Sequence, residues 1–429
     1  MRQPSSQPSS QPTGRQTSRA SNRAFRLALK QAHLVALAMV ALVAGCGEGQ
    51  KPPPVPSAEA KLQLRPVSFQ LVPGWSQDNQ SEALVAFMRS CERLLPQPPD
   101  RPIGGDVPGT VGDFREPCLA ARTVPQDPVA ARRFFETYFA PYLATANGDA
   151  TGLFTGYYEP ILKGCLRPRT GCSVPLYRRP ADLVEVDLGQ FRESLKGQRV
   201  AGRVEGSKLV PYADRGAIDG GALLGRGLEI AFVEDGTEAF FLHVQGSGRI
   251  QLDDGRVLRV GYSGQNGFEY TSIGRELVRR GELTLDQASM QSIQTWVRRN
   301  PAKAAELFAA NRSYVFFEPR EGEGPLGTQG APLTPGRSLA VDRRFVPLGL
   351  PLWVDLEFAG SPYQPGPADR IQRLMVAQDT GGAIKGAVRG DFFWGAGPQA
   401  GAFAGRMKSR GAYFLLLPRT LAQRVASLS

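Results

Sequence analysis

Histidine is scarce in this chain of 429 residues, which contains only two. One lies in an N-terminal segment that we expect to be removed, so a Ser-His-Asp or Cys-His mechanism would have to use His243. His243 lies in residues 239–244, where apolar and polar positions alternate as in a β-strand. We expect a half-buried structural histidine there, and nucleophilic acyl transfer is disfavoured.

Cysteine is also scarce, with five residues, of which Cys91, Cys118, Cys165 and Cys172 follow the N-terminal segment. An even number suggests disulfides in an oxidising compartment. Cys165 and Cys172 would close a short loop and leave Cys91 to pair with Cys118, although four cysteines allow three pairings. No C-x2-C spacing occurs, so a zinc site is disfavoured and no metal is expected.

No apolar run is long enough for a transmembrane helix, which needs roughly 20 residues. The run from Leu34 to Ala44 is shorter, and six basic residues and no acidic residue lie in residues 1–45. This pattern predicts a secretory signal. Cys46 follows small residues, as in the bacterial lipoprotein box, so we expect residues 1–45 to be cleaved and Cys46 to be lipidated. Gly47 then implies sorting to the outer membrane; a simple signal peptide with a coincidental cysteine is the alternative.

The excess of positive charge is partly a property of this leader. The net charge of +11 falls to +5 without residues 1–45, because six basic residues leave with them. The remaining charge suits a mildly anionic polymer, and no nucleic-acid-binding motif is present. Prolines after Lys51 predict a tether over residues 46–64.

The chain after residue 45 is long enough for two domains. Helical periodicity predicts helices at residues 81–94, 129–143, 272–280, 285–297 and 302–310. Short strands are predicted at residues 228–233, 239–244, 256–260, 352–356, 374–377 and 413–417. Residues 321–335 read as a linker or surface loop. The last hundred residues read as a compact β unit, for which a closed barrel is suitable.

Two aspartates lie in a glycine-dense block near the C-terminus. The block reads Val376-Ala377-Gln378-Asp379-Thr380-Gly381-Gly382-Ala383-Ile384-Lys385-Gly386, followed by Arg389-Gly390-Asp391-Phe392-Phe393-Trp394-Gly395. Glycine lets the backbone approach a ligand closely. A carboxyl group beside apolar rings can keep its proton near neutral pH, as a general acid must. We therefore predict that the chemistry takes place here.

Five segments together resemble the membrane-bound lytic murein transglycosylase A family. They are Leu71–Trp75 with Ser90-Cys91, Phe154–Pro160, His243–Gly248, Gly261-Tyr262 with Asn266-Gly267, and the block that contains Asp342, Asp379 and Asp391. The resemblance covers residues 65 to 420. It implies a mainly β fold with peripheral helices: a double-psi β-barrel from residues 65–159 and 325–421, a barrel-like β-rich insertion over residues 160–324, and a sugar-binding groove between them.

The resemblance also implies the reaction, which is cleavage of the β-1,4 bond between N-acetylmuramic acid and N-acetylglucosamine with formation of a 1,6-anhydromuramoyl end. Hydrolytic glycosidases generally need two carboxyl groups. Here the sugar's own 6-hydroxyl replaces water, and effective molarities of ~10⁵ M or more make a second base dispensable. No cofactor is expected. A hydrolytic glycosidase on the same fold and a non-catalytic murein-binding lipoprotein are the alternatives.

Asp391 matches the family's catalytic aspartate and is the predicted acid and base. Asp379 is the alternative acid, with Asp391 orienting it. Asp342 either supports the site or is a salt-bridged structural residue. Asp379 and Asp342 would raise the proton affinity of Asp391 and Lys385 would oppose this, while residues 392–394 could supply an apolar wall.

Residues that could contact sugar come from two further segments. Thr155, Gly156, Tyr157 and Tyr158 are predicted to line the groove, although paired tyrosines in a strand often belong to a core. Gln245, Gly246, Ser247 and Gly248 are predicted to form a sugar-contacting turn, with a purely structural turn as the alternative. No role is assigned to Glu159.

We expect a monomer at the periplasmic face of the outer membrane, anchored by its N-terminal lipid. Its expected partners are peptidoglycan glycan strands, with murein synthases or amidases as candidate protein partners.

Overall fold

The computed structural model describes residues 61–195, 198–358 and 369–428. The predicted signal peptide, the lipidated Cys46 and most of the predicted tether lie outside these residues. Within them, no helix has the length and apolar character that crossing a membrane requires. The last part of the predicted tether is a strand, because Leu62–Pro66 (β1) pairs with Phe139–Ala146 (β2).

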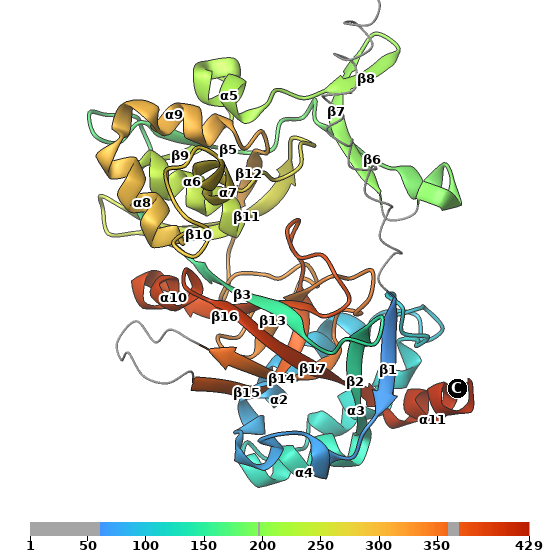
Figure 1. The fold of residues 1–429 in the computed structure, drawn as a ribbon. Coiled ribbons are helices and arrows are strands. Elements are labelled where there is room, and N and C mark those ends of the chain that lie inside the picture. The colour runs from blue at the N-terminus through green and yellow to red at the C-terminus, as the bar shows by residue number, and fades with distance from the viewer. Residues whose placement is uncertain (1–60, 196–197, 359–368, 429) are drawn as a thin grey trace, which may run out of the picture. The chain divides into compact units, whose positions relative to one another are not determined.

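Eight strands form the larger sheet in the order β1-β2-β17-β14-β15-β13-β16-β3 (Figure 1). The remaining members are β3 (Gly152–Glu159), β13 (Ser338–Val341), β14 (Pro351–Phe358), β15 (Asp369–Asp379), β16 (Arg389–Ala396) and β17 (Lys408–Pro418). Because β17 also pairs with β3, six of these strands close into a ring. The mainly β fold is thus confirmed, and the double-psi connection stays a prediction.

Two of the barrel strands contain long runs of buried residues. Residues 351–356 of β14 and 413–418 of β17 are all buried. Such buried runs, apolar here except for Asp355, are typical of strands that are covered on both faces. Trp353, Leu415 and Phe154 belong to this core.

Three helices that precede β3 in the sequence pack on the barrel. They are α2 (Gln80–Leu94), α3 (Gly112–Ala121) and α4 (Pro128–Tyr138). Asn79 caps α2 by accepting a hydrogen bond from the backbone N–H of Ser81. The ring of Phe87 on α2 lies within 6.0 Å of the rings of Phe134 and Phe135 on α4, and the Cys91–Cys118 disulfide joins α2 to α3.

Residues between β3 and β13 form a second β structure with its own core. Its six-stranded sheet has the order β12-β11-β10-β4-β9-β5, and its members are β4 (Ile161–Cys165), β5 (Val174–Tyr177), β9 (Glu229–Val233), β10 (Ser247–Leu252), β11 (Val257–Gln265) and β12 (Val315–Pro319). A bridge between Arg178 and Phe317 brings the end of β5 to β12, so this sheet nearly closes on itself.

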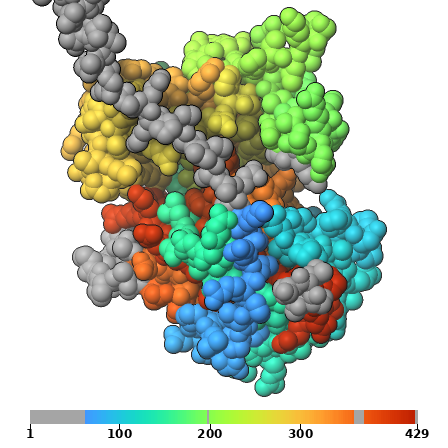
Figure 2. Space-filling model, turned by 45° about the vertical axis from the view of Figure 1, so that its right-hand side comes forward, coloured from blue at the N-terminus to red at the C-terminus, as the bar shows by residue number. Residues whose placement is uncertain are grey.

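A small three-stranded sheet, β6 (Val184–Asp187), β7 (Arg199–Glu205) and β8 (Lys208–Pro211), lies at the surface of this region (Figures 1 and 2). The helices of the region between β3 and β13 are α5 (Arg215–Ala217), α6 (Gly236–Gln245), α7 (Ile273–Arg279), α8 (Met290–Arg299) and α9 (Pro301–Ala309). The C-terminal barrel segment adds α10 (Gly397–Ala404) and α11 (Arg419–Leu428).

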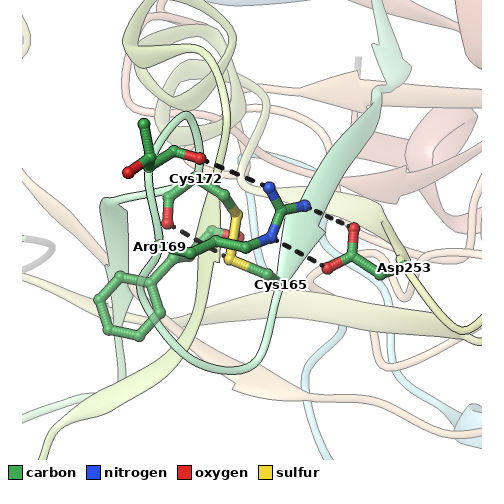
Figure 3. The surroundings of a disulfide bond; sticks show 6 residues. Cys165, Arg169, Cys172 and Asp253 are labelled. Atoms are coloured by element: carbon green, nitrogen blue, oxygen red, sulfur yellow. Dashed lines mark hydrogen bonds and ion pairs between the residues drawn. A yellow bond between two sulfur atoms is a disulfide. The ribbon is translucent and has the colours of Figure 1, made fainter.

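The second disulfide closes the loop between β4 and β5. Cys165 is joined to Cys172, and both disulfides therefore follow the pairing that closeness in sequence favours. Arg169 in this loop forms an ion pair of 2.7 Å with Asp253, which follows β10 (Figure 3).

Three predicted elements differ from the structure. The strand predicted at residues 239–244 is wrong: these residues form α6, which begins after the capping residue Asp235 and ends at Gly246 in the left-handed conformation. The helix predicted at residues 129–143 ends at Tyr138, and β2 begins at the next residue. The helix predicted to begin at Leu285 begins at Met290, after the capping box of Ser289 and Ser292.

Candidate active site

Asp391 lies in the middle of three paired strands. It belongs to β16, which runs parallel to β3 with Asp391 opposite Thr155, and antiparallel to β13 with Asp391 opposite Ala340. The Thr155 hydroxyl donates a short hydrogen bond to Oδ1 of Asp391. Asp391 as a whole is half-buried.

Asp379, at the end of β15, is held by many more donors. Its Oδ1 accepts from the backbone N–H of Thr328 at 2.8 Å, from the Thr328 hydroxyl at 2.9 Å and from the backbone N–H of Thr380 at 2.9 Å. Its Oδ2 accepts from the hydroxyl of Tyr157 at 3.1 Å. Four donors on one carboxyl group favour its charged form.

The two aspartates therefore differ in how strongly their charge is stabilised. Burial raises the pKa of Asp391 to about 6, and the nearby charge of Asp379 adds to this, while Thr155 and Arg389 lower it. Burial also raises the pKa of Asp379, but its hydrogen bonds from Thr328, Thr380 and Tyr157 act against the rise. The arrangement suits Asp391 as a proton donor beside a charged Asp379.

Asp342 was predicted to lie near Asp391 and to raise its proton affinity, but its contacts are with other residues. Burial alone would raise its pKa, but hydrogen bonds from Arg344 and the backbone N–H of Gly386 lower it below its usual value. The Arg344 contact is an ion pair of 2.7 Å and the Gly386 contact is 2.8 Å long. The charges that act on Asp391 are those of Asp379 and Arg389, so the predicted effect of Asp342 on Asp391 is wrong. Asp342 instead anchors the loop between the two other aspartates.

The aromatic residues after Asp391 divide between the two faces of β16, because side chains alternate along a strand. Phe393 shares the face of Asp391, and its ring centroid lies 5.1 Å from that of Tyr157. Trp394 packs instead on Phe392 and Phe403, with centroids 4.6 and 4.9 Å away. Only Phe393 can therefore wall the Asp391 side. Lys385 is exposed, and the cation that acts on Asp391 is Arg389.

The segment Thr155–Tyr158 has both site and structural contacts. Thr155 and Tyr157 contact the two aspartates. Gly156 has no room for a side chain, since an added Cβ would lie 2.6 Å from Nε1 of Trp394. The backbone N–H of Tyr158 donates to Oε1 of Gln245 at 3.0 Å, which links β3 to the end of α6.

The turn at residues 245–248 has clear structural constraints. Gly246 ends α6 with a φ of 78°, and a Cβ on Gly248 would lie 2.4 Å from the side chain of Leu242. Ser247 opens β10. Contact with sugar at these residues stays a prediction.

His243 and Glu159 are both buried structural residues. Nδ1 of His243 accepts from the backbone N–H of Val315 at 3.3 Å, and burial holds its pKa well below the usual value. Glu159 forms ion pairs of 2.8 Å with Arg249 and 3.3 Å with Arg259. The described part of the chain has no group of three or more acidic, histidine or cysteine side chains that could hold a metal ion.

Two residues of this site were not predicted from the sequence. Thr328 lies in the segment that reads as a linker, yet its backbone and hydroxyl both bind Asp379. Arg389 is buried and donates to the Thr155 hydroxyl at 2.8 Å. A signal for Arg389 was present, because it precedes Asp391 by two residues and so shares its face of the strand.

A closed β-barrel with two neighbouring aspartates, one of which has a pKa raised to about 6, is an arrangement that an acid–base enzyme can use. Two family models match the chain, one described as the MltA specific insert domain over residues 153–318 and one as the 3D domain over residues 337–417. Membrane-bound lytic murein transglycosylase A of Vibrio cholerae is 33% identical over 274 residues, which are 63% of this chain and 67% of that protein. The Escherichia coli K12 protein of the same name is 33% identical over 265 residues, 61% of this chain and 65% of that protein.

Solved structures agree with this result. A membrane-bound lytic murein transglycosylase from Agrobacterium tumefaciens has a TM-score of 0.75 and 35% identity, and the match covers 84% of this chain and 99% of that one. MltA from Neisseria gonorrhoeae has a TM-score of 0.69 and 36% identity, with 83% and 93% covered. MltA from Escherichia coli with bound chitohexaose has a TM-score of 0.59 and 25% identity, with 84% and 95% covered. The chain belongs to the membrane-bound lytic murein transglycosylase A family.

Proposed function

We propose that this protein is a lytic transglycosylase of peptidoglycan, which cleaves the β-1,4 bond between N-acetylmuramic acid and N-acetylglucosamine and leaves a 1,6-anhydromuramoyl end. Its relatives are named lytic murein transglycosylases, and one of them was crystallised with chitohexaose. The observation that carries the assignment is the contrast between the aspartates, since Asp391 has one hydroxyl donor while Asp379 has four hydrogen bonds.

In the proposed mechanism, protonated Asp391 gives its proton to the glycosidic oxygen as the bond from that oxygen to C1 of the muramoyl sugar breaks. The positive charge that develops on the sugar ring is then captured by the sugar's own 6-hydroxyl. Charged Asp391 takes the proton from this hydroxyl as the new bond between O6 and C1 forms. One carboxyl group thus serves both steps, and Asp379 stays charged beside it.

The supporting contacts suggest roles for the neighbouring residues. We propose that Tyr157 and Tyr158 line the sugar groove between the barrel (residues 65–159 and 325–421) and the inserted region (residues 160–324). Gly156 has no side chain, which leaves room for Trp394 to pack against this segment. Gln245, Gly246 and Ser247 would contact sugar from the inserted side, and Lys385, exposed in its loop, would do so from the barrel side.

The proposed location is the periplasmic face of the outer membrane, with the lipid on Cys46. The relatives' names support attachment to a membrane. We propose that the protein acts as a monomer, with murein synthases or amidases as candidate partners.

The test is a digestion of purified murein by the wild type, Asp379→Asn and Asp391→Asn, with mass spectrometry of the products. We expect wild-type fragments to be lighter than hydrolytic ones by one water. Asp391→Asn should lose about 10²-fold or more of the rate, as is usual when a general acid is removed, and should still bind murein. Products with ordinary reducing ends would instead indicate a hydrolase, and full activity of Asp391→Asn would exclude its catalytic role.

A further inference from the structure

Arg389 is a buried cation whose contacts are unusual for an arginine. It is 9% exposed, and within the described residues it forms no ion pair with a carboxylate. Its Nη1 donates to the backbone carbonyls of Leu153, at 3.2 Å, and Gly390. Its Nη2 donates to the Thr155 hydroxyl at 2.8 Å. Burying a charge without an ion-pair partner is costly. The hydrogen bond to Thr155 indicates which residue Arg389 acts on.

The guanidinium group fixes the direction of the Thr155 hydroxyl. Arginine can only donate, whereas a hydroxyl has one hydrogen and can also accept. Since Oγ1 of Thr155 accepts from Arg389, its single hydrogen is left for Oδ1 of Asp391, at the short contact between them. Oδ1 then accepts a hydrogen bond whether Asp391 is charged or neutral, and the proton of the neutral acid belongs on Oδ2.

We propose that Arg389 is a positioning residue: it turns the Thr155 hydroxyl onto Oδ1 of Asp391, so that Oδ2 is the oxygen that gives and takes the catalytic proton. This inference rests on the proposed function, because it assigns an atom to the acid and base role of Asp391. Arg389 itself does not need to touch the substrate.

The charges around Asp391 give the proposal a measurable signature. The titratable groups that face it are Asp379 from β15, Arg389 from β16 and the Tyr157 phenol from β3, while β13 presents Ala340 opposite it. On β17, Lys408 is paired with Thr155 rather than with Asp391. Thr155 and Arg389 both lower the pKa of Asp391. Loss of either should therefore make Asp391 hold its proton to higher pH.

The experiment measures the pH profile of kcat/KM for anhydro-product formation in Arg389→Met, Arg389→Lys, Thr155→Val and Thr155→Ser. We expect Arg389→Met and Thr155→Val to lose on the order of 10²-fold at the optimum, as when a reacting group is misplaced, and their alkaline limb to move to higher pH. Thr155→Ser keeps the hydroxyl and should retain most of the rate with the wild-type limb. Arg389→Lys keeps a donor and should lie in between.

A double variant separates positioning from a general loss of structure. Arg389 acts through Thr155, so in the Thr155→Val background the Arg389→Met change should cost much less than it does in the wild type. Additive losses, or lower rates with an unmoved alkaline limb, would overturn the proposal. If Arg389→Met does not fold, the proposal is tested by comparing Thr155→Val, Thr155→Ser and Arg389→Lys. Equal rates in these three variants would exclude the positioning role of Arg389.

Asp391→Asn serves as the reference in the same assay. An active Asp391→Asn would refute the proposed function itself. An inactive Asp391→Asn combined with wild-type profiles for the Arg389 and Thr155 variants would refute only the positioning role.

Discussion

Asp391 holds its proton in a pH range in which most aspartates are charged, because burial and the charge of Asp379 raise its pKa to about 6. A general acid must be protonated at the start of the reaction. We therefore predict that kcat/KM for anhydro-product formation is flat below about pH 6 and falls tenfold per pH unit above it. If the rate instead begins to fall at a pH far from 6, another group controls the alkaline side of the profile.

Asp379→Asn should move that limb in the opposite direction from Arg389→Met. The charge of Asp379 raises the pKa of Asp391, and its removal lowers that pKa, so the alkaline limb should move to lower pH. The measurement is the pH–rate profile of this variant, with Asp253→Asn as a control because Asp253 pairs with Arg169 at an exposed position. A limb that moves upward would show that Asp379 does not act on Asp391 by its charge.

The same raised pKa has a cost in stability. In the folded protein the pKa of Asp391 is about 6 against the usual 3.8, so the neutral form is preferred. Its contribution to stability is fully present below pH 3.8 and is lost as the pH rises through 6. At pH 8 the charged group should destabilise the fold by about 2 to 3 kcal/mol, from 1.36 kcal/mol per pKa unit.

Asp391→Asn should consequently be more stable than the wild type by up to about that amount at pH 8, and equally stable near pH 4. Urea unfolding at the two pH values measures the difference. Equal stability at both would mean that the site does not penalise the charge of Asp391.

At the residue scale the sequence indicated Asp391 as the candidate acid, a role that stays a prediction, but it did not indicate the residues that hold the two aspartates in place. Asp391 stands in a recognisable motif, and its shared strand face with Phe393 follows from alternation alone. Thr328 could not be predicted, because nothing local to residues 321–335 indicates that this segment turns back onto Asp379. The effect of Asp342 was predicted wrongly, since the sequence does not show which charges end up close to Asp391 in the fold.

Among the elements, the failures have local physical causes. The α6 segment is buried at Ala239 and at residues 240–243, so it lacks the polar stripe by which an amphipathic helix is recognised. Its capping residue Asp235 and the final Gly246 were the available signals. Strands β14 and β17 were located correctly but drawn too short, because their outer residues are less apolar.

Strand β3 links the barrel to the inserted region through one buried charge. Glu159, at its end, is 1% exposed and pairs with Arg249 of β10 and Arg259 of β11. Removing one partner of a buried ion pair leaves uncompensated charges, at a cost of about 3 kcal/mol. We predict that Glu159→Gln lowers the free energy of unfolding by roughly this amount.

Urea unfolding of Glu159→Gln beside Asp253→Asn measures this. The control makes the same carboxyl-to-amide change opposite an arginine, but at the exposed Arg169 pair, where we expect no measurable loss. Equal effects of the two changes would contradict a structural role for the burial of Glu159.

The whole molecule depends on contacts between distant parts of the sequence. Strand β3 pairs with β16 and β17, more than 230 residues later, and the ring closes only after the inserted region has been made. Hydrophobic patterns indicate strands but not their partners, so the barrel was implied by the resemblance rather than by periodicity, and its strand order was not predicted. The predicted division of the chain at residues 160 and 324 likewise rests on it.

The two disulfides should contribute unequally to the stability of the whole molecule. Cys91–Cys118 spans 27 residues and Cys165–Cys172 spans 7. Loop-closure entropy predicts stabilisations of about 3.5 and 2.5 kcal/mol, because the longer loop restrains the unfolded chain more. The sites are separate, so the effects should add to about 6 kcal/mol, a large part of a typical stability of roughly 5 to 15 kcal/mol.

We therefore predict that the reduced protein is only marginally stable and depends on an oxidising compartment. Urea unfolding of the oxidised wild type, of Cys91→Ser with Cys118→Ser, and of Cys165→Ser with Cys172→Ser should place the first pair's loss above the second's. Reduction of the wild type should match their sum. A larger loss on removing the Cys165–Cys172 disulfide would show that this change disturbs the folded loop, where Arg169 pairs with Asp253, more than it frees the unfolded chain.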